Sequence, residues 1–178
     1  PGLPQGVRDI TYEIVGVTVN AERQPVVDFK ILSDGVALDV LALPEDLTAA
    51  ARYPGFLLSY ALPQDNIDEP AEYNNIGLSA AQPLSVSLGD LLDGTAGSVV
   101  AGAEGAATAT FNDAFPEGAT LRSIALQGYF NQTINGVTVA RHTYSVVKEA
   151  SGNTVRREVV ETNKYLASHE TIEGHGGN

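Results

Sequence analysis

The sequence predicts an all-β fold, either an antiparallel sandwich or a split β-barrel with Greek-key connections, with at most two short helices. Three observations support this prediction. Short runs rich in β-branched residues recur along the chain and are separated by turn residues. An Asn-Gly pair at positions 135 and 136 lies between two such runs, which is typical of a β-hairpin. Only two short segments carry the charge and capping pattern of a helix.

Six strands are expected before residue 112. Ile10–Val19 is rich in β-branched residues and partly alternates, and Val26–Ile31 alternates more cleanly. The second run ends at the turn residues Ser33–Gly35, after which Val36–Val40 can pair back. Phe56–Leu62 is nearly all apolar, so we expect a strand that is buried on both faces. Further strands are expected at Leu84–Leu88 and, more weakly, at Ala106–Phe111.

Three consecutive antiparallel strands are expected in the C-terminal half. Ser123–Phe130 leads through Asn135-Gly136 into Val137–Val147, and both turn residues tolerate the positive φ of a type I′ turn. Ser151–Asn153 then turns the chain into a third run, Val155–Val160. Strands at this spacing favour a sandwich or split barrel.

Helices are expected at two places. Pro44–Arg52 begins with acidic residues and ends with arginine, which suits the helix dipole, and Pro54 stops it. Ser87–Gly94 can form one helical turn closed by its glycine. Two segments are expected as long loops, the acidic Pro63–Asn75 and the Gly/Ala-rich Gly94–Gly105.

Composition narrows the classes of function. The 178 residues are enough for one domain with a core, and the absence of cysteine excludes disulfides, thiolate metal sites and covalent c-type haem. The net charge of −12 argues against nucleic acid and anionic membranes as partners. No apolar run approaches the ~20 residues that span a bilayer. The start of the chain lacks the pattern of a signal peptide and an initiator Met, so a processed or trimmed chain is expected.

Side chains capable of catalysis or metal binding are few. His142 is expected to be a surface residue. Four acids of the 63–75 loop offer carboxylate oxygens of the kind that Ca²⁺ prefers, but their spacing fits no EF-hand loop, so a solvated acidic loop is the favoured interpretation. Asn131-Gln132-Thr133 fits the glycosylation sequon. No fingerprint of a hydrolase, P-loop or dinucleotide site occurs, and no catalytic residue or enzymatic activity is predicted. The four acids are Asp65, Asp68, Glu69 and Glu72.

The C-terminal segment carries a specific motif. Tyr165-Leu166-Ala167-Ser168-His169 would become C-x-x-C-H, the attachment signature of a c-type haem, if cysteine stood at positions 165 and 168. In that signature the two thiols bond to the haem and the adjacent His ligates iron. Here the His is present and both thiols are missing. A second histidine begins the run His175-Gly176-Gly177-Asn178.

These residues resemble the C-x-x-C-H…H-G-G-N pattern of outer-surface decahaem cytochromes of metal-reducing bacteria, the OmcA/MtrC family. Val155–Val160 is similar to the strand that precedes the first haem site there, and Pro25–Ile31 resembles the first-strand pattern more loosely. The resemblance implies a β-domain, residues 1–160, followed by a stub of a haem-binding segment, residues 161–178. It identifies Tyr165, Ser168, His169 and His175 as the remnant of a haem site, while this chain itself is expected to hold no cofactor.

The resemblance also implies a function. In that family the haems carry electrons to extracellular acceptors such as metal oxides, and the β-domain is non-catalytic. Expected partners are haem domains of the same or a parent polypeptide and other outer-membrane cytochromes, at the bacterial outer-membrane surface and outside the cell. The alternative is an extracellular β-domain for adhesion or ligand binding with no redox role. Further C-x-x-C-H motifs in a longer gene would distinguish the two.

Overall fold

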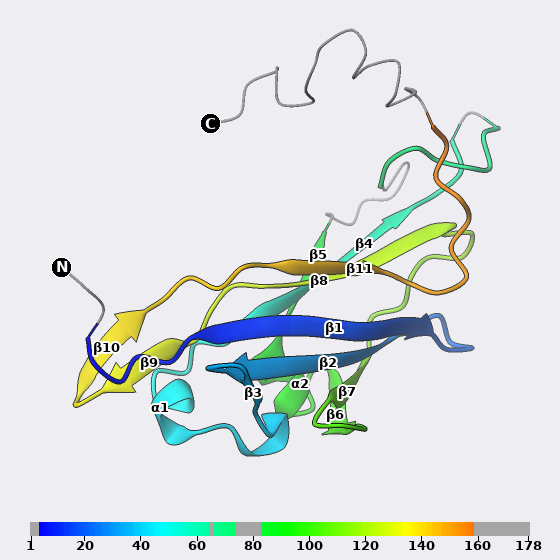
Figure 1. Ribbon diagram of the computed structural model, residues 1–178. Coiled ribbons are helices and arrows are strands. Elements are labelled where there is room, and N and C mark those ends of the chain that lie inside the picture. The colour runs from blue at the N-terminus through cyan, green and yellow to red at the C-terminus, as the bar shows by residue number, and fades with distance from the viewer. Residues whose placement is uncertain (1–3, 65, 74–82, 159–178) are drawn as a thin grey trace, which may run out of the picture.

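The fold is a sandwich of two antiparallel sheets (Figure 1). The computed structural model describes residues 4–64, 66–73 and 83–158. All strand pairs are antiparallel, which confirms the predicted fold class in its sandwich form. The first sheet has the order β1 (Ile10–Val19), β2 (Pro25–Ser33), β7 (Ala107–Phe111) and β6 (Gly97–Ala101), with the short β3 (Val36–Ala37) paired to β2. The second sheet has the order β11 (Val146–Glu149), β8 (Leu121–Gln127), β4 (Gly55–Ala61) and β5 (Leu84–Ser87).

This strand order is that of an immunoglobulin-type sandwich. Taken in chain order, β1, β2, β4, β5, β6, β7, β8 and β11 occupy the places A, B, C, C′, D, E, F and G, because A-B-E-D form one sheet and G-F-C-C′ the other. The inter-sheet disulfide and the buried Trp of antibody domains are impossible here, since the chain has neither Cys nor Trp. The architecture is shared by many unrelated functions and by itself assigns none.

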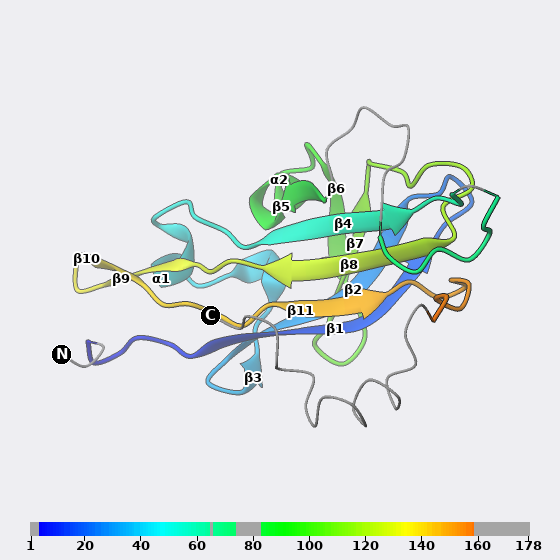
Figure 2. The ribbon, with the colours of Figure 1, turned by 90° about the horizontal axis from the view of Figure 1, so that it is seen from above.

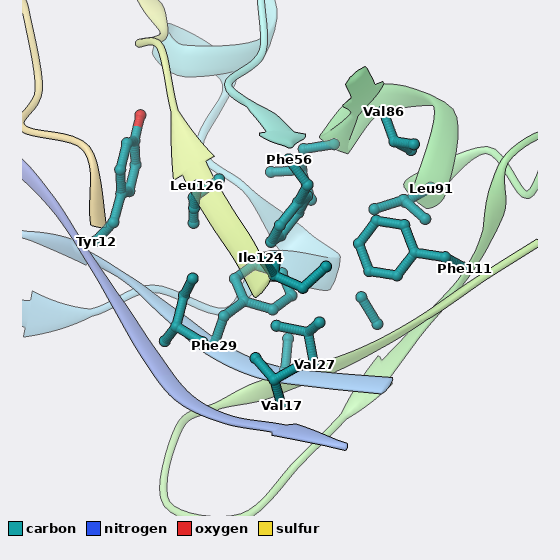
Figure 3. Close-up of a cluster of buried hydrophobic side chains, with 14 of the residues drawn as sticks. Tyr12, Val17, Val27, Phe29, Phe56, Val86, Leu91, Phe111, Ile124 and Leu126 are labelled. Atoms are coloured by element: carbon teal, nitrogen blue, oxygen red, sulfur yellow. The ribbon is translucent and has the colours of Figure 1, made fainter. Parts of the chain in front are cut away.

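Three phenylalanines join the two sheets in place of a disulfide. Phe56 of β4 packs edge-to-face against Phe29 of β2 and Phe111 of β7, with ring centroids 5.1 and 5.3 Å apart (Figure 3). All three are fully buried. Alternation along β1, β2, β4 and β7 places every second side chain in this core, as a half-buried strand requires. Phe56–Leu62 was expected to be buried on both faces, but Leu57 and Ser59 are only half-buried.

Both expected helices form, but the first is shorter than the predicted Pro44–Arg52, because it ends at Thr48 and Arg52 is not part of it. α1 (Glu45–Thr48) begins with two acids after Pro44, and α2 (Leu88–Leu92) is capped by the Ser87 hydroxyl, which accepts from the Gly89 N–H at 3.1 Å. Gly94 follows α2 with a φ of +85°, as predicted for a closing glycine. A 3₁₀ turn, Val40–Ala42, is capped by Asp39 and ends the expected 36–40 strand after two residues. None of the described helices is long and apolar enough to cross a membrane.

Residues 121–149 form one long hairpin with a break in the middle (Figure 2). β9 (Asn131–Ile134) and β10 (Val137–Ala140) are joined by the predicted Asn-Gly turn, whose residues have φ of +49° and +77°. β8 and β11 continue the same pairing, from Leu126↔Val146 to Ser123↔Glu149. Four residues, 127–130, separate the two ladders on one side and five, 141–145, on the other. The predicted continuous strand over 137–147 is therefore wrong, because residues 141–145 do not pair with β8 or β9 and belong to no strand.

Two other strand predictions need correction. Gly94–Gly105 was expected as a loop, yet β6 lies within it and pairs with all of β7. Val155–Val160 was expected as a strand, but its described part, residues 155–158, is not in a strand. The acidic 63–75 loop is a loop over its described residues apart from a single bridge, Gln64↔Ile67.

Candidate functional site

The predicted haem-site remnant, Tyr165, Ser168, His169 and His175, lies outside the described residues, as does the expected boundary between residues 160 and 161. The structure does describe the segment that leads toward it. Residues 150–158 leave β11 and run beside the loop that follows β4, at one end of the sandwich (Figure 1). The candidate site is therefore the place where the chain leaves the sandwich.

A turn over residues 150–154 fixes the first step of this exit. The Ser151 N–H donates to the Val17 carbonyl of β1 at 2.9 Å, which ties the second sheet to the first. The Asn153 side chain binds Arg122 of β8 three times. Its Oδ1 accepts from the backbone N–H and from Nε of Arg122, both at 3.1 Å, and its Nδ2 donates to the Arg122 carbonyl at 2.9 Å. Thr154 N–H donates to the Thr120 carbonyl at 3.0 Å. The turn is thus held by both sheets.

Four side chains then join Arg156 of the exit segment to the acidic loop and the loop to β11; we call Glu72, Tyr73, Glu149 and Arg156 the exit clamp. The Arg156 guanidinium lies 5.5 Å from the centroid of the Tyr73 ring, pairs with the Glu72 carboxylate at 2.9 Å, and donates to the Ala71 carbonyl at 3.1 Å. The Tyr73 hydroxyl donates to Glu149 of β11 at 3.0 Å. One arginine therefore contacts a carboxylate, a carbonyl and an aromatic face on the same loop.

Tyr73 is the central member of the exit clamp. Burial is the largest cause that raises the pKa of its phenol, the Ser123 hydroxyl beside it lowers this pKa, and Glu149 raises it again. The phenol thus stays protonated and donates to Glu149 at neutral pH. Ser123 lies on β8 and Glu149 on β11, so Tyr73 fastens the loop to two neighbouring strands of the second sheet.

The acidic loop acts here through pairing with the exit segment. Among the described residues, no group of three or more His, Asp or Glu side chains is arranged to hold a metal ion. The Glu72 carboxylate points at Arg156. Asp65 lies outside the described residues, so the Ca²⁺ interpretation of the four acids stays untested.

His142 lies in the break of the long hairpin. Its side chain is exposed, as predicted, but residues 141–145 are not in a strand. Its ring meets Tyr129 edge-on with centroids 5.1 Å apart, and the Arg52 guanidinium lies 4.5 Å from the centroid of the same Tyr129 ring. The Tyr129 ring is therefore in contact with two of the protein's own side chains. Asn131, of the sequon, is half-buried within β9.

Sequence reasoning did not find the exit clamp. Tyr73 and Arg156 are 83 positions apart, and the stretch that contains Arg156, Val155–Val160, was interpreted as a strand. The one available signal was charge, since an acidic loop and the basic Arg156-Arg157 pair stand in one chain of net charge −12. No protein-family model matches this chain, and no curated protein matches it either.

Proposed function

We propose that this chain is the non-catalytic β-domain of an extracellular multihaem cytochrome, at the bacterial outer-membrane surface. Its role is to hold the start of a haem-binding segment in a fixed direction. The observation that carries the proposal is the Tyr165-x-x-Ser168-His169 motif with the following His175-Gly-Gly-Asn run. Electron transfer to extracellular acceptors such as metal oxides belongs to haem domains of the same or a parent polypeptide, while this domain supplies position and a low-dielectric neighbour.

The exit clamp supports this role. Residue 158 is the last described residue before the motif, and residues 150–157 are held by backbone and side-chain contacts to β1, β8 and the acidic loop. A segment with so many anchors leaves the sandwich in one direction. Haem spacing governs electron transfer, so a rigid exit is what a β-domain in such a wire needs.

Restoring the missing thiols tests the proposal directly. We expect the double variant Tyr165→Cys, Ser168→Cys to acquire covalent haem when it is exported in cells with c-type haem attachment machinery, because the axial histidine is already in place. Haem is measured by a stain that survives denaturing electrophoresis. His169→Ala in the same double-Cys background is the matched control and should stay unstained, and so should the unaltered chain.

The outcome that counts against the proposal is equally clear. A folded, exported double-Cys variant without haem, beside a c-type cytochrome that matures in the same cells, would show that the motif is a coincidence. Absence of C-x-x-C-H motifs in the gene downstream of residue 178 would have the same consequence. The domain would then be an extracellular β-domain for adhesion or ligand binding.

A further inference from the structure

Arg157 differs from the other arginines of the chain, all of which lie in its described part. The guanidinium groups of the others each contact a carboxylate, a carbonyl or amide oxygen, or an aromatic ring. These contacts are Arg8 with Asp46, Arg23 with the Phe115 carbonyl, Arg52 with the Tyr129 ring, Arg122 with Asn153, Arg141 with Asp9, and Arg156 with Glu72. The Arg157 side chain is exposed and has no hydrogen bond, ion pair or aromatic contact to another described residue. It is therefore available to a protein that recognises arginine.

The backbone around Arg157 is accessible as well. Residues 155–158 are exposed and belong to no strand, at one end of the sandwich (Figure 1). Thr154 is the last residue with a short backbone bond to the sandwich, at 3.0 Å from the Thr120 carbonyl. The Arg157 N–H donates to the Pro70 carbonyl at 3.5 Å, which is longer than an ordinary N–H···O bond. An exposed segment with so few backbone bonds is a preferred place for proteolytic cleavage.

The geometry favours cleavage after Arg157. An endopeptidase of the trypsin class binds its substrate as an added strand, so main-chain groups give affinity and a pocket selects one side chain. Besides the residue that precedes the cut, it uses the N–H and carbonyl of the residue two positions earlier. For a cut after Arg157 that residue is Val155, which is 79% exposed and whose backbone groups have no hydrogen bond within the described part of the chain.

Cleavage after Arg156 is hindered at two points. The residue two positions earlier is then Thr154, whose N–H is already bonded to Thr120. The Arg156 guanidinium must also leave Glu72, Tyr73 and the carbonyl of Ala71 before it can enter the pocket of an enzyme. The exit clamp thus protects one arginine of the pair and leaves its neighbour open to attack.

We propose that the peptide bond between Arg157 and Glu158 is a processing site, at which an arginine-specific endopeptidase cuts the folded protein. The C–N bond is hydrolysed, so water supplies the hydroxyl of the new Arg157 carboxyl group and the hydrogen of the new Glu158 amine. The cut falls after β11 and after the Asn153 turn, so one product keeps all the described strands. The other product carries the Tyr165–His169 motif. This inference does not depend on haem binding, since it concerns release of the sandwich from whatever follows it.

Limited digestion of the full chain tests this proposal. The probe is an arginine-specific endopeptidase under native conditions, and the products are identified by intact mass at early times. We expect the first product to end at Arg157 and then to resist further cleavage. Arg157→Gln should abolish this product and slow the first cut by about tenfold or more, since only the protected bond after Arg156 remains nearby. Arg156→Gln is the matched control, and its product should still end at Arg157 and form at least as fast.

A second pair of variants tests the protection of Arg156. Glu72→Gln weakens the hold on the Arg156 guanidinium and should raise the share of product that ends at Arg156, while Glu69→Gln, an exposed acid of the same loop, should leave that share unchanged. Equal rates of cleavage after Arg156 and Arg157 in the unaltered chain would overturn the proposal. So would a first cut at any arginine before residue 156, or a folded chain that stays intact at an enzyme concentration that cleaves the urea-denatured chain.

Discussion

The two ends of β11 differ in how their backbone groups are satisfied. At the C-terminal end, Ser151 bonds to β1, Thr154 bonds to Thr120, and the Asn153 side chain binds both the N–H and the carbonyl of Arg122. At the N-terminal end, residues 141–144 have no such partners among the described residues, and Tyr12 takes the Gly128 carbonyl that a ladder would use. The first end is closed and the second is open.

The difference shows that the two ends of one strand can be held in different ways. Both ends belong to the same long hairpin, and both lie beside β1. The two ends differ in two respects. At the open end, one side of the hairpin has one residue more than the other. At the closed end, the Asn153 side chain bonds to the backbone of Arg122. The hydrogen bonds at the C-terminal end of β11 fix the direction in which the exit segment leaves the sandwich. At the N-terminal end, the backbone groups of residues 141–144 have no strand partner among the described residues. We expect local stability to be high at the closed end and lower at the open end.

The largest expected effect comes from the core that both ends share. Phe56→Ala removes the ring that contacts Phe29 and Phe111 and leaves a cavity between the sheets. Such truncations cost about 3–5 kcal/mol in the free energy of unfolding. We expect this loss in urea denaturation and faster exchange of the amides of β11 and β8, which pair with each other in the second sheet. Unchanged exchange of these amides would mean that the hairpin does not share one cooperative core with Phe56.

The next largest effect is a loss of stability at alkaline pH, and it comes from Tyr12, which lies beside the open end. Burial raises the pKa of Tyr12 to about 12 from an ordinary value of 10, whereas the Thr143 hydroxyl lowers it. Since the folded pKa is the higher one, this contribution is complete below pH 10 and is lost as the pH rises through 12. Two pKa units correspond to about 2–3 kcal/mol. Urea denaturation from pH 9 to 12 should show this decline, and Tyr12→Phe should show a shallower one.

A smaller effect is expected at the closed end. Asn153→Ala removes three hydrogen bonds and leaves the Arg122 N–H without its acceptor, while the Arg122 carbonyl keeps the bond from Ala150. An unsatisfied, part-buried donor costs about 1–3 kcal/mol. The exposed Ser145→Ala at the open end is the control, and it should change the free energy of unfolding by less than about 0.5 kcal/mol. Equal losses in the two variants would remove the distinction between the ends.

Local pattern was enough to predict much of the fold. The bounds predicted for β1 are those observed, and the Asn-Gly hairpin turn and the glycine that closes α2 formed as expected. These features depend on side chains within a few positions of one another, such as Ser87 with Gly89. The sandwich class followed from the same strands, but their order in the sheets did not.

What the sequence did not predict depends on contacts between distant residues. β6 offers only the short Val99-Val100 pair as a strand signal among small residues, and it becomes a strand by pairing with β7. A Cβ added to Gly97 would lie 2.1 Å from the Thr110 carbonyl oxygen. The backbones of β6 and β7 therefore come so close together at this position that only glycine fits. Residues 155–158 resembled a strand, yet Arg156 binds the acidic loop across 83 positions. The exit clamp was missed for the same reason, since no pattern within a short window records it.

The smallest effect on stability is expected from the exit clamp, and it bears most directly on the proposed function. Arg156→Ala removes the guanidinium from Glu72, Ala71 and Tyr73. The ion pair is exposed, with 42% and 81% of the two side chains accessible, so the free energy of unfolding should fall by no more than about 1 kcal/mol.

Local order should change far more than global stability in this variant. We expect the amides of residues 155–158 to exchange faster by tenfold or more, while those of β8 and β4 stay unchanged. Arg157→Ala is the matched control, because Arg157 contacts the loop through its backbone N–H, at 3.5 Å from the Pro70 carbonyl, and should leave exchange as it was. If the two variants behave alike, Arg156 does not hold the exit segment. The direction of the chain beyond residue 158 would then be set by the Asn153 turn, and the role proposed for the acidic loop would be wrong.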